Sequence, residues 1–247
     1  MAGHNKWSKI KHRKAVVDKR RGKVWTKISK ALIVAARHGG PDPDANLALR
    51  YAMDEARYAN MPRDTVERAI RKGAGGEDTS NYENIRYEGY GPGGVAVIIE
   101  TLTDNRARTV GDIRLAFSDH GGNIGGSGCV AYMFAARGRI VVAAEGLVED
   151  TVMERAIDAG ATDVERLDEG DEDHPPSWII WTEAGAFAAV KNDVEKAGLP
   201  VADAGIVMVP DNHVSVSGEQ AETIAALIES LEDLDDVQKV YSNASFE

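Results

Sequence analysis

Side chains that can bind phosphate are concentrated at the N-terminal end of the chain. The first thirty residues contain eleven Lys or Arg and one acidic residue, Asp18. Residues 1–72 contain 18 basic and 7 acidic residues and carry a formal charge of +11, whereas residues 73–247 contain 11 basic and 33 acidic residues and carry −22. Because a basic end on an acidic body attracts polyanions at that end alone, this distribution predicts a nucleic-acid partner.

The candidate phosphate-binding residues divide into a short arm and the helix that follows it. In the arm, Trp7 could stack on an exposed base or anchor the arm to the protein. In the helix, basic residues recur at intervals of three and four from Arg20 to Lys30, which places them on one face, whereas Arg21 falls on the apolar side. The residues expected to bind nucleic acid are Lys6, Trp7, Lys9, Lys11, His12, Arg13, Lys14, Lys19, Arg20, Arg21, Lys23, Lys27 and Lys30.

Two other interpretations of the basic end stay open. A charged helix face is commonly just solvated and aids solubility, although a solubility face would not need to oppose the sign of the whole protein. The basic end could instead dock on the acidic body, within the chain or in a dimer. Exposed ion pairs contribute less than about 1 kcal/mol each, so such docking would be salt-sensitive and could act as a gate that nucleic acid displaces.

Residues that could support catalysis or hold a metal are sparse. None of the six histidines is paired with another ligand at a spacing typical of metal sites. Cys129 could act as a nucleophile with His120 nearby, but a small buried strand residue is the commoner interpretation. The acidic run 168–173 lacks the spaced ligands and closing Glu of a calcium loop. We therefore expect a protein that is not an enzyme, with no metal, no cofactor and no small-molecule substrate.

The glycine-rich segments 89–94 and 121–128 resemble phosphate-binding loops in composition only. Each precedes a predicted strand, whereas the glycine motif of a dinucleotide site or a P-loop leads into a helix. Tight turns or a mobile loop are the better interpretation, although backbone N–H groups there could still bind an anion. The chain has no recognition-helix, zinc-finger or leucine-zipper signature, so its residues do not indicate base-specific readout.

The composition fits a protein of the cytoplasm. A single cysteine excludes an intramolecular disulfide and fits a reducing compartment. No apolar stretch approaches the roughly 20 residues of a membrane span, and the N-terminus lacks the apolar core of a secretory signal. Its basic residues continue directly into a predicted helix, so we expect a mature N-terminus rather than a transit peptide. We expect a cytoplasmic location and no membrane partner, and a weak homo-oligomer is left open.

The periodicity of the apolar residues predicts helices first and strands later. Up to about residue 76, apolar residues recur at intervals of three and four, as at Trp25, Ile28 and Leu32. We expect Asp42 or Asp44 to cap the second helix. Strand-like segments follow a polar, glycine-rich boundary. From residue 138 to residue 209 the expected order is β-α-β-β-α-β, which is ferredoxin-like.

These elements predict an α+β multidomain protein. An N-terminal all-helical domain precedes two ferredoxin-like α+β domains, one inserted in the other. The expected domains are residues 1–78, which are basic and helical, residues 79–136 with 206–247, which form a discontinuous α+β domain, and residues 137–205, the inserted domain.

Five segments of the sequence resemble the YebC/PmpR family, whose eukaryotic relative is the mitochondrial translational activator of cytochrome oxidase. They are AGHNKWSKIKHRK, DKRRGKVWTKISKAL, NMPRDTVERAIRKGAG, YEGYGPGGVAVIIETLTDNRART and HGGNIGGSGCVAYMF. The resemblance is dense over the first 134 residues. It implies a helical N-terminal domain and two α+β domains, one inserted in the other.

The resemblance also implies a function. The family is described as cytoplasmic transcriptional regulators that bind DNA, and in another description as translation factors that relieve stalled ribosomes. A nucleic-acid role carries over best to the basic residues from Lys6 to Lys30. We therefore expect a DNA-binding transcriptional regulator that acts through its basic arm and helix. The alternative is a translation factor that binds the ribosome through ribosomal RNA.

Overall fold

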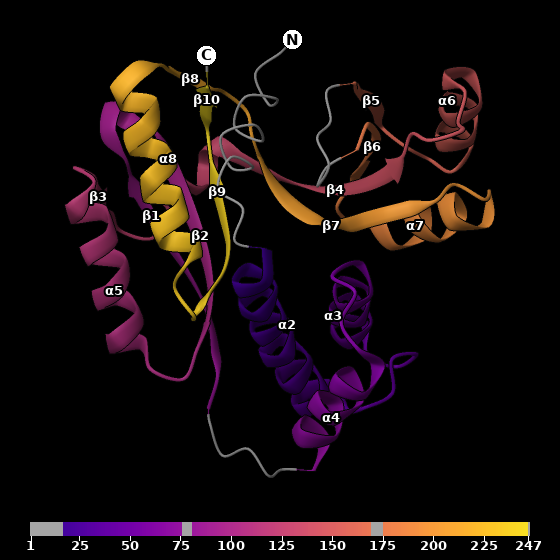
Figure 1. The fold of residues 1–247 in the computed structure, drawn as a ribbon, viewed down its shortest axis with the longest axis horizontal. Coiled ribbons are helices and arrows are strands. Elements are labelled where there is room, and N and C mark those ends of the chain that lie inside the picture. The colour runs from indigo at the N-terminus through magenta and orange to yellow at the C-terminus, as the bar shows by residue number, and fades with distance from the viewer. Residues whose placement is uncertain (1–16, 76–80, 169–174, 247) are drawn as a thin grey trace. The chain divides into compact units, whose positions relative to one another are not determined.

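The chain folds into a mixed α+β structure with helices ahead of the sheets, as the sequence predicts. The computed structural model describes residues 17–75, 81–168 and 175–246, and Figure 1 shows its fold. Two compact units are present: Met1–Phe134 together with Pro210–Glu247, and Ala135–Val209. The finer division into three domains, with limits at residues 78, 136 and 205, stays a prediction.

Three helices form the N-terminal part of the first unit. They are α2 (Val17–Gly39), α3 (Leu47–Tyr58) and α4 (Arg63–Ala74). Ile28, Leu32 and Ala36 share one face of α2 and are at most 3% exposed, in a cluster with apolar residues of α3 and α4. Gly73 lets α4 approach α2 closely, since a Cβ atom there would lie 2.3 Å from the carbonyl oxygen of Ile33.

The cap of α3 is Asn46, so the expectation of Asp42 or Asp44 was wrong. Asn46 Oδ1 accepts a hydrogen bond from the N–H of Leu49 at 3.1 Å, and Asn46 Nδ2 donates to the carbonyl oxygen of Ala35 in α2 at 2.8 Å. An amide can serve both helices because it has an acceptor and a donor, whereas a carboxylate has no donor.

The sheet of the first unit has the strand order β3-β1-β2-β9. Its strands and helices are β1 (Glu83–Tyr90), β2 (Ala96–Thr103), α5 (Arg106–Asp119), β3 (Asn123–Ile124), α8 (Gly218–Glu232) and β9 (Val237–Ser242). A separate parallel pair joins β8 (Val214–Val216) to β10 (Ala244–Phe246). Helices α5 and α8 lie side by side on the sheet (Figure 1), where Phe117, Leu227 and Ile99 share one buried core.

This sheet does not have the ferredoxin-like order that was expected of it. Strands β1 and β2 form an antiparallel hairpin before the first helix of the unit's sheet. They are joined by a 3₁₀ turn, Pro92–Gly94, in which Gly93 and Gly94 have φ angles of 71° and 78°. The turn connects β1 directly to the antiparallel strand β2, whereas a ferredoxin-like unit has a helix between its first two strands.

The second unit has the β-α-β-β-α-β order predicted for residues 138–209. Its strand order is β5-β6-β4-β7. The elements are β4 (Phe134–Ala143), α6 (Glu149–Asp158), β5 (Asp163–Leu167), β6 (Ser177–Glu183), α7 (Phe187–Lys196) and β7 (Val201–Pro210). Ile140 and Ile180 of the sheet, Val152 of α6 and Val194 of α7 are fully buried, as expected where helices cover a sheet.

The chain leaves the first unit and returns to it at neighbouring points. The N–H of Asp211 donates a hydrogen bond to the carbonyl oxygen of Met133 at 2.9 Å. Met133 is the second-last residue before the second unit begins, and Asp211 is the second residue after that unit ends.

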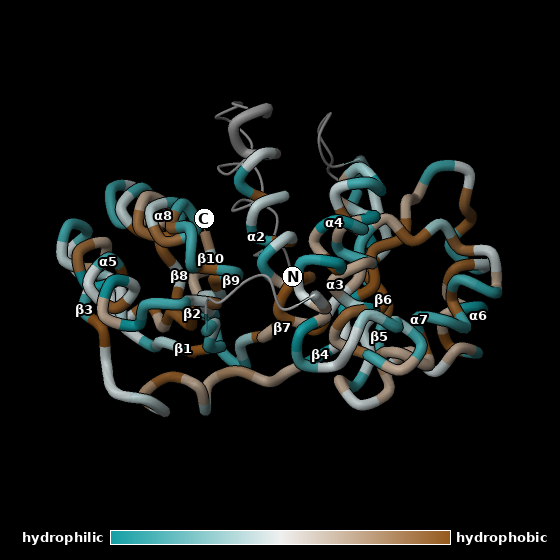
Figure 2. The backbone as a smooth tube through the Cα atoms, turned by 90° about the horizontal axis from the view of Figure 1, so that it is seen from below, coloured by the Kyte–Doolittle hydropathy of each residue, from teal (hydrophilic) through white to brown (hydrophobic). Residues whose placement is uncertain are grey.

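The helices are amphipathic rather than uniformly apolar. In Figure 2 the tubes of α5, α6 and α8 alternate between teal and brown along their length. Among the helices in the part of the chain that the structure describes, none is both long and apolar enough to span a bilayer.

Candidate nucleic-acid interface

Helix α2 carries three of the predicted phosphate-binding lysines on one face. Lys23, Lys27 and Lys30 are separated by four and three residues, so they lie roughly above one another. The apolar residues Ile28 and Leu32 point to a different side of the helix and are buried. The sequence prediction of one basic face on this helix therefore agrees with the backbone.

All three ammonium groups contact the end of α8 and the loop that follows it. Lys23 Nζ lies 3.1 Å from Asp233 Oδ1 and 3.3 Å from the carbonyl oxygen of the same residue. Lys27 Nζ donates to the carbonyl oxygen of Glu232 at 2.6 Å. Lys30 Nζ donates to the carbonyl oxygen of Asp235 at 3.0 Å and to Asp236 Oδ1 at 3.1 Å. We call residues 232–236 the acidic turn, and its contacts with these lysines the lysine clasp.

The clasp supplies cations where a helix end needs them. The last carbonyl groups of a helix lack intrahelical partners and carry the negative end of its dipole. Helix α8 has no basic residue in its own last turn. Lysines from α2 take that place, and the acidic side chains of the turn add further negative charge.

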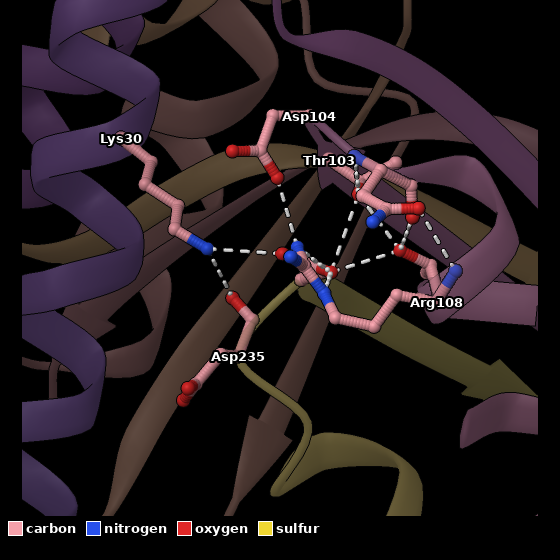
Figure 3. A network of polar contacts seen from close by, with 8 residues as sticks. Lys30, Thr103, Asp104, Arg108 and Asp235 are labelled. Carbon is pink, nitrogen blue, oxygen red and sulfur yellow. Dashed lines mark hydrogen bonds and ion pairs between the residues drawn. The ribbon is translucent and has the colours of Figure 1, made fainter. Parts of the chain in front are cut away.

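One member of the acidic turn, Asp236, is buried in a polar network, and Figure 3 labels its partners Lys30, Thr103 and Arg108. Its side chain is 6% exposed, and Arg108 Nη2 donates to its Oδ2 at 2.7 Å. The hydroxyls of Thr109 and Thr103 lie 2.8 and 3.2 Å from the same oxygen. Burial alone would raise the pKa of Asp236, but hydrogen bonds from Arg108, Thr109 and Lys30 hold this pKa below its ordinary value.

The same network fixes the start of α5. Asn105 caps the helix, with its Oδ1 accepting from the N–H of Arg108 at 3.1 Å. The Arg108 guanidinium also contacts Asp104 Oδ1 at 2.9 Å. Figure 3 shows Lys30 approaching from α2 while Arg108 approaches from α5. Asp236 therefore links α2 to the sheet of the first unit.

Lys27 is partly buried at the clasp. Its pKa lies below the ordinary value because burial penalises the ammonium group, an effect that the negative charge of Glu232 partly offsets. The clasp therefore holds Lys27 partly desolvated, with its ammonium group against the end of α8.

The remaining predicted binding residues fall into two groups. Lys19, Arg20 and Arg21 lie in the first turns of α2, where the structure describes the backbone but not the side chains. The arm lies outside the described residues, and it comprises Lys6, Trp7, Lys9, Lys11, His12, Arg13 and Lys14. Neither group is tested by the geometry.

Gly22 leaves the backbone of α2 without a covering side chain one residue before Lys23. It is exposed, and a Cβ atom at this position would have no neighbour within 4 Å among the described residues. Glycine within a helix costs about 0.5–1 kcal/mol relative to alanine. Packing among the described residues gives no reason for this glycine.

Arg63 and Arg68 of α4 make contacts within their own helix. Arg63 Nε contacts Glu67 Oε1 at 2.8 Å, and Arg68 Nε donates to the carbonyl oxygen of Asp64 at 3.2 Å. These are contacts within one turn of a solvated helix. They agree with the absence of a recognition-helix signature in the sequence.

The backbone on both sides of Cys129, at the end of the second glycine-rich segment, is held by a carboxylate that the sequence reasoning missed. Glu88 is 4% exposed and accepts hydrogen bonds from the N–H groups of Gly128, Val130 and Ala131, each at 2.8 Å. Burial would raise the pKa of Glu88, but these three bonds lower it below the ordinary value. The only signal in the sequence was an acidic residue among the apolar and glycine residues of a strand.

The surroundings of Cys129 disfavour its thiolate form. Burial, and then the negative charge of Glu88, raise the pKa of its thiol. The Tyr90 hydroxyl donates to the carbonyl oxygen of Cys129 at 2.8 Å and fixes the backbone there. Over residues 17–75, 81–168 and 175–246, no group of three His, Cys, Asp or Glu side chains is arranged to hold a metal ion.

Comparisons with known proteins cover nearly the whole chain. The family model described as "TACO1/YebC protein N-terminal domain" matches residues 5–76, and the one described as "TACO1/YebC second and third domain" matches residues 82–244. The resemblance inferred from the sequence motifs is confirmed by these matches.

Relatives and a solved structure agree with the family models. A probable transcriptional regulatory protein of Bordetella petrii is 51% identical over 247 residues, which are 100% of this chain and 99% of that protein. One of Cupriavidus taiwanensis is 49% identical over 247 residues and 100% of both chains. The crystal structure of a conserved hypothetical protein from Aquifex aeolicus is 43% identical, with a TM-score of 0.84 over 98% of this chain and 97% of that one.

Proposed function

The chain belongs to the TACO1/YebC family, and on that basis we propose that it is a cytoplasmic transcriptional regulator that binds DNA through its basic arm and helix α2. Its relatives of about 50% identity are named as probable transcriptional regulatory proteins. The observation that carries the proposal is the charge of +11 on residues 1–72 beside −22 on the rest. Such a chain approaches a polyanion with one end.

The chemistry of the interface is phosphate neutralisation rather than base reading. Each lysine or arginine placed on a duplex phosphate releases condensed counterions, which favours binding and makes it salt-dependent. Contacts of this kind set the position and orientation of a protein but carry no sequence information. Any preference for particular promoters would have to come from DNA shape or from a further partner.

Gly22 supports a close approach at the start of the interface. The exposed helix backbone there leaves room for a phosphate chain to lie against α2. The lysine clasp already supplies acceptors to the three lysines that follow. Contact with DNA would therefore begin at the arm and at Lys19 to Arg21.

The test is the salt dependence of binding to a 30-base-pair duplex of random sequence. Neutralising five arm residues (K6Q, K9Q, K11Q, R13Q and K14Q) should weaken binding. It should also flatten the plot of log affinity against log salt, by up to about 0.9 for each duplex phosphate that the variant no longer neutralises. Lys196→Gln, an exposed charge of the second unit, is the control and should change neither. An unchanged slope in the arm variant would contradict the proposal.

The alternative, a ribosome-associated translation factor, depends on the same basic residues, so a separate experiment is needed to distinguish it. A transcriptional regulator should prefer discrete chromosomal sites by a few kcal/mol over random duplex. Chromatin immunoprecipitation with the tagged protein should yield sharp promoter peaks. Their absence, together with co-sedimentation with ribosomes at moderate salt, would favour the translation factor.

A further inference from the structure

We propose that the acidic turn is a built-in competitor for the lysines of α2, so that the lysine clasp must open before Lys23, Lys27 and Lys30 can bind nucleic acid. This inference rests on the proposed function and adds a regulatory step to it. The clasp would hold the helix in a low-affinity state, and a polyanion already bound at the arm would displace the turn.

The acidic turn offers the lysines what a phosphate backbone would offer. Three carbonyl oxygens and two carboxylate oxygens accept from the three ammonium groups at 2.6–3.3 Å. The carbonyls of Glu232 and Asp233 belong to a helix end with a negative dipole, and the carboxylates of Asp233 and Asp236 add negative charge to the surface facing α2. Phosphates placed on these lysines would meet Asp233 and Asp235, which are exposed and like-charged. The turn and a nucleic-acid strand therefore exclude one another.

The contacts of the clasp are separate from most of the hydrogen bonds that hold Asp236 in place. When Lys30 leaves, Asp236 Oδ2 keeps the Arg108 guanidinium and the hydroxyls of Thr103 and Thr109, whereas Oδ1 loses the hydrogen bond from Lys30. The Asp233 side chain is 63% exposed, so water can replace Lys23 there. Exposed ion pairs of this kind are individually weak.

The hydrogen bond of Lys27 also favours replacement of the acidic turn by a phosphate chain. It is partly buried, and it donates a hydrogen bond to the neutral carbonyl oxygen of Glu232 at 2.6 Å. A phosphate oxygen carries a negative charge and forms a stronger, charge-assisted hydrogen bond with an ammonium group. Exchanging this carbonyl for a phosphate oxygen would therefore strengthen the hydrogen bond that Lys27 donates.

Reversing the charge of Asp233 tests this competition between the acidic turn and nucleic acid, which we call the gate. Asp233→Lys should repel Lys23 and open the clasp, and binding to a 30-base-pair random duplex at low salt should tighten. The matched control is Glu222→Lys, an exposed position near the start of α8 that changes the net charge by the same amount away from the clasp. We expect Asp233→Lys to exceed the control by about two- to fivefold in affinity, the range that release of one exposed pair allows.

Hydrogen exchange of the unaltered protein gives a second readout that needs no substitution. Binding usually slows amide exchange, but displacement of the lysines should leave the last turn of α8 without its cations. We expect the amides around residues 229–237 to exchange faster when the duplex is bound. Slower or unchanged exchange there, or equal affinities of the two variants, would overturn the gate while leaving DNA binding in place.

The failure of the proposed function would look different. If neither the wild type nor any variant bound the duplex, the proposed function and the gate would both be wrong. If only Asp233→Lys bound, with the control as weak as the wild type, the gate would be supported in its strongest form.

Discussion

Lys30 Nζ lies 3.1 Å from Asp236 Oδ1, although 206 positions separate the two residues in the sequence. The lysine comes from the basic face of α2, and the aspartate from the acidic turn. The pair joins helix α2 to a carboxylate that Arg108 and Thr109 also bind. The residues expected to bind phosphate and the residues that fix the sheet therefore meet in one network.

The buried carboxylate should matter more to stability than its exposed neighbour. Asp236→Ala removes the acceptor for Arg108, Thr103 and Thr109, and it should lower the free energy of unfolding by about 1–3 kcal/mol. Asp235→Ala, which keeps its backbone carbonyl for Lys30, should stay within about 0.5 kcal/mol of the wild type. Urea denaturation of both variants measures the difference. Equal losses would show that the network is not what stabilises this end of the sheet.

Glu88 should make the fold sensitive to acid. Its pKa is lowered in the folded protein, so the carboxylate contributes stability above the unfolded value of about 4.3 and loses it as the pH falls through the folded value. Glu88→Gln should cost about 1–3 kcal/mol at pH 7, and its deficit against the wild type should shrink below about pH 4. Urea midpoints from pH 7 to pH 3 test this, with the exposed Glu183→Gln as a control. A deficit that is constant with pH would contradict the role given to these three hydrogen bonds.

Gly22 offers a separation of stability from binding. Gly22→Ala should raise the free energy of unfolding by about 0.5–1 kcal/mol because alanine favours the helix, yet it should weaken duplex binding by placing a methyl group against the phosphate chain. Gly111→Ala in α5 is the matched control, since that glycine is also exposed and also has no described atom within 4 Å of its Cβ position. It should stabilise the protein similarly and leave binding unchanged. Equal effects of both variants on binding would remove the argument for close approach at α2.

The thiol of Cys129 should react slowly. Since burial and Glu88 raise its pKa, less thiolate is present than in a free thiol at the same pH, and the thiolate is the reactive form. Alkylation by iodoacetamide at pH 7.5 should be slower than that of glutathione, and Cys129→Ala should leave duplex binding unchanged. Labelling as fast as that of the free thiol would reopen the case for a nucleophile.

Local patterns in the sequence predicted the helices well and the contacts between distant elements poorly. The spacing of Ile28 and Leu32 was enough to place the buried face of α2, because it reflects the helical repeat. The sequence analysis did not recognise that the β1–β2 hairpin departs from the ferredoxin-like order. The Pro92–Gly94 turn indicates that the chain reverses there, but it does not indicate the order of the strands in the sheet. Asn46 was missed because its side chain caps α3 and also binds a carbonyl oxygen of α2, a contact that no local pattern indicates.

In the candidate site, too, the sequence predicted the local features and not the contacts between distant segments. The face formed by Lys23, Lys27 and Lys30 follows from spacing alone, and docking of the basic end on the acidic body was one of the interpretations left open. The identity of the acceptors could not be predicted, since three of them are backbone carbonyls with no side-chain signature. Glu88 likewise acts on backbone N–H groups some forty residues away, which no local pattern encodes.

The hydrogen bond between Met133 and Asp211 has a practical consequence for dissecting the protein. Because the two crossings of the chain are adjacent, a turn of a few residues should close the gap that deletion of 135–209 would leave. Such a shortened chain would retain α2, the acidic turn and the network around Asp236. It would reveal which of the protein's partners recognise the second unit alone.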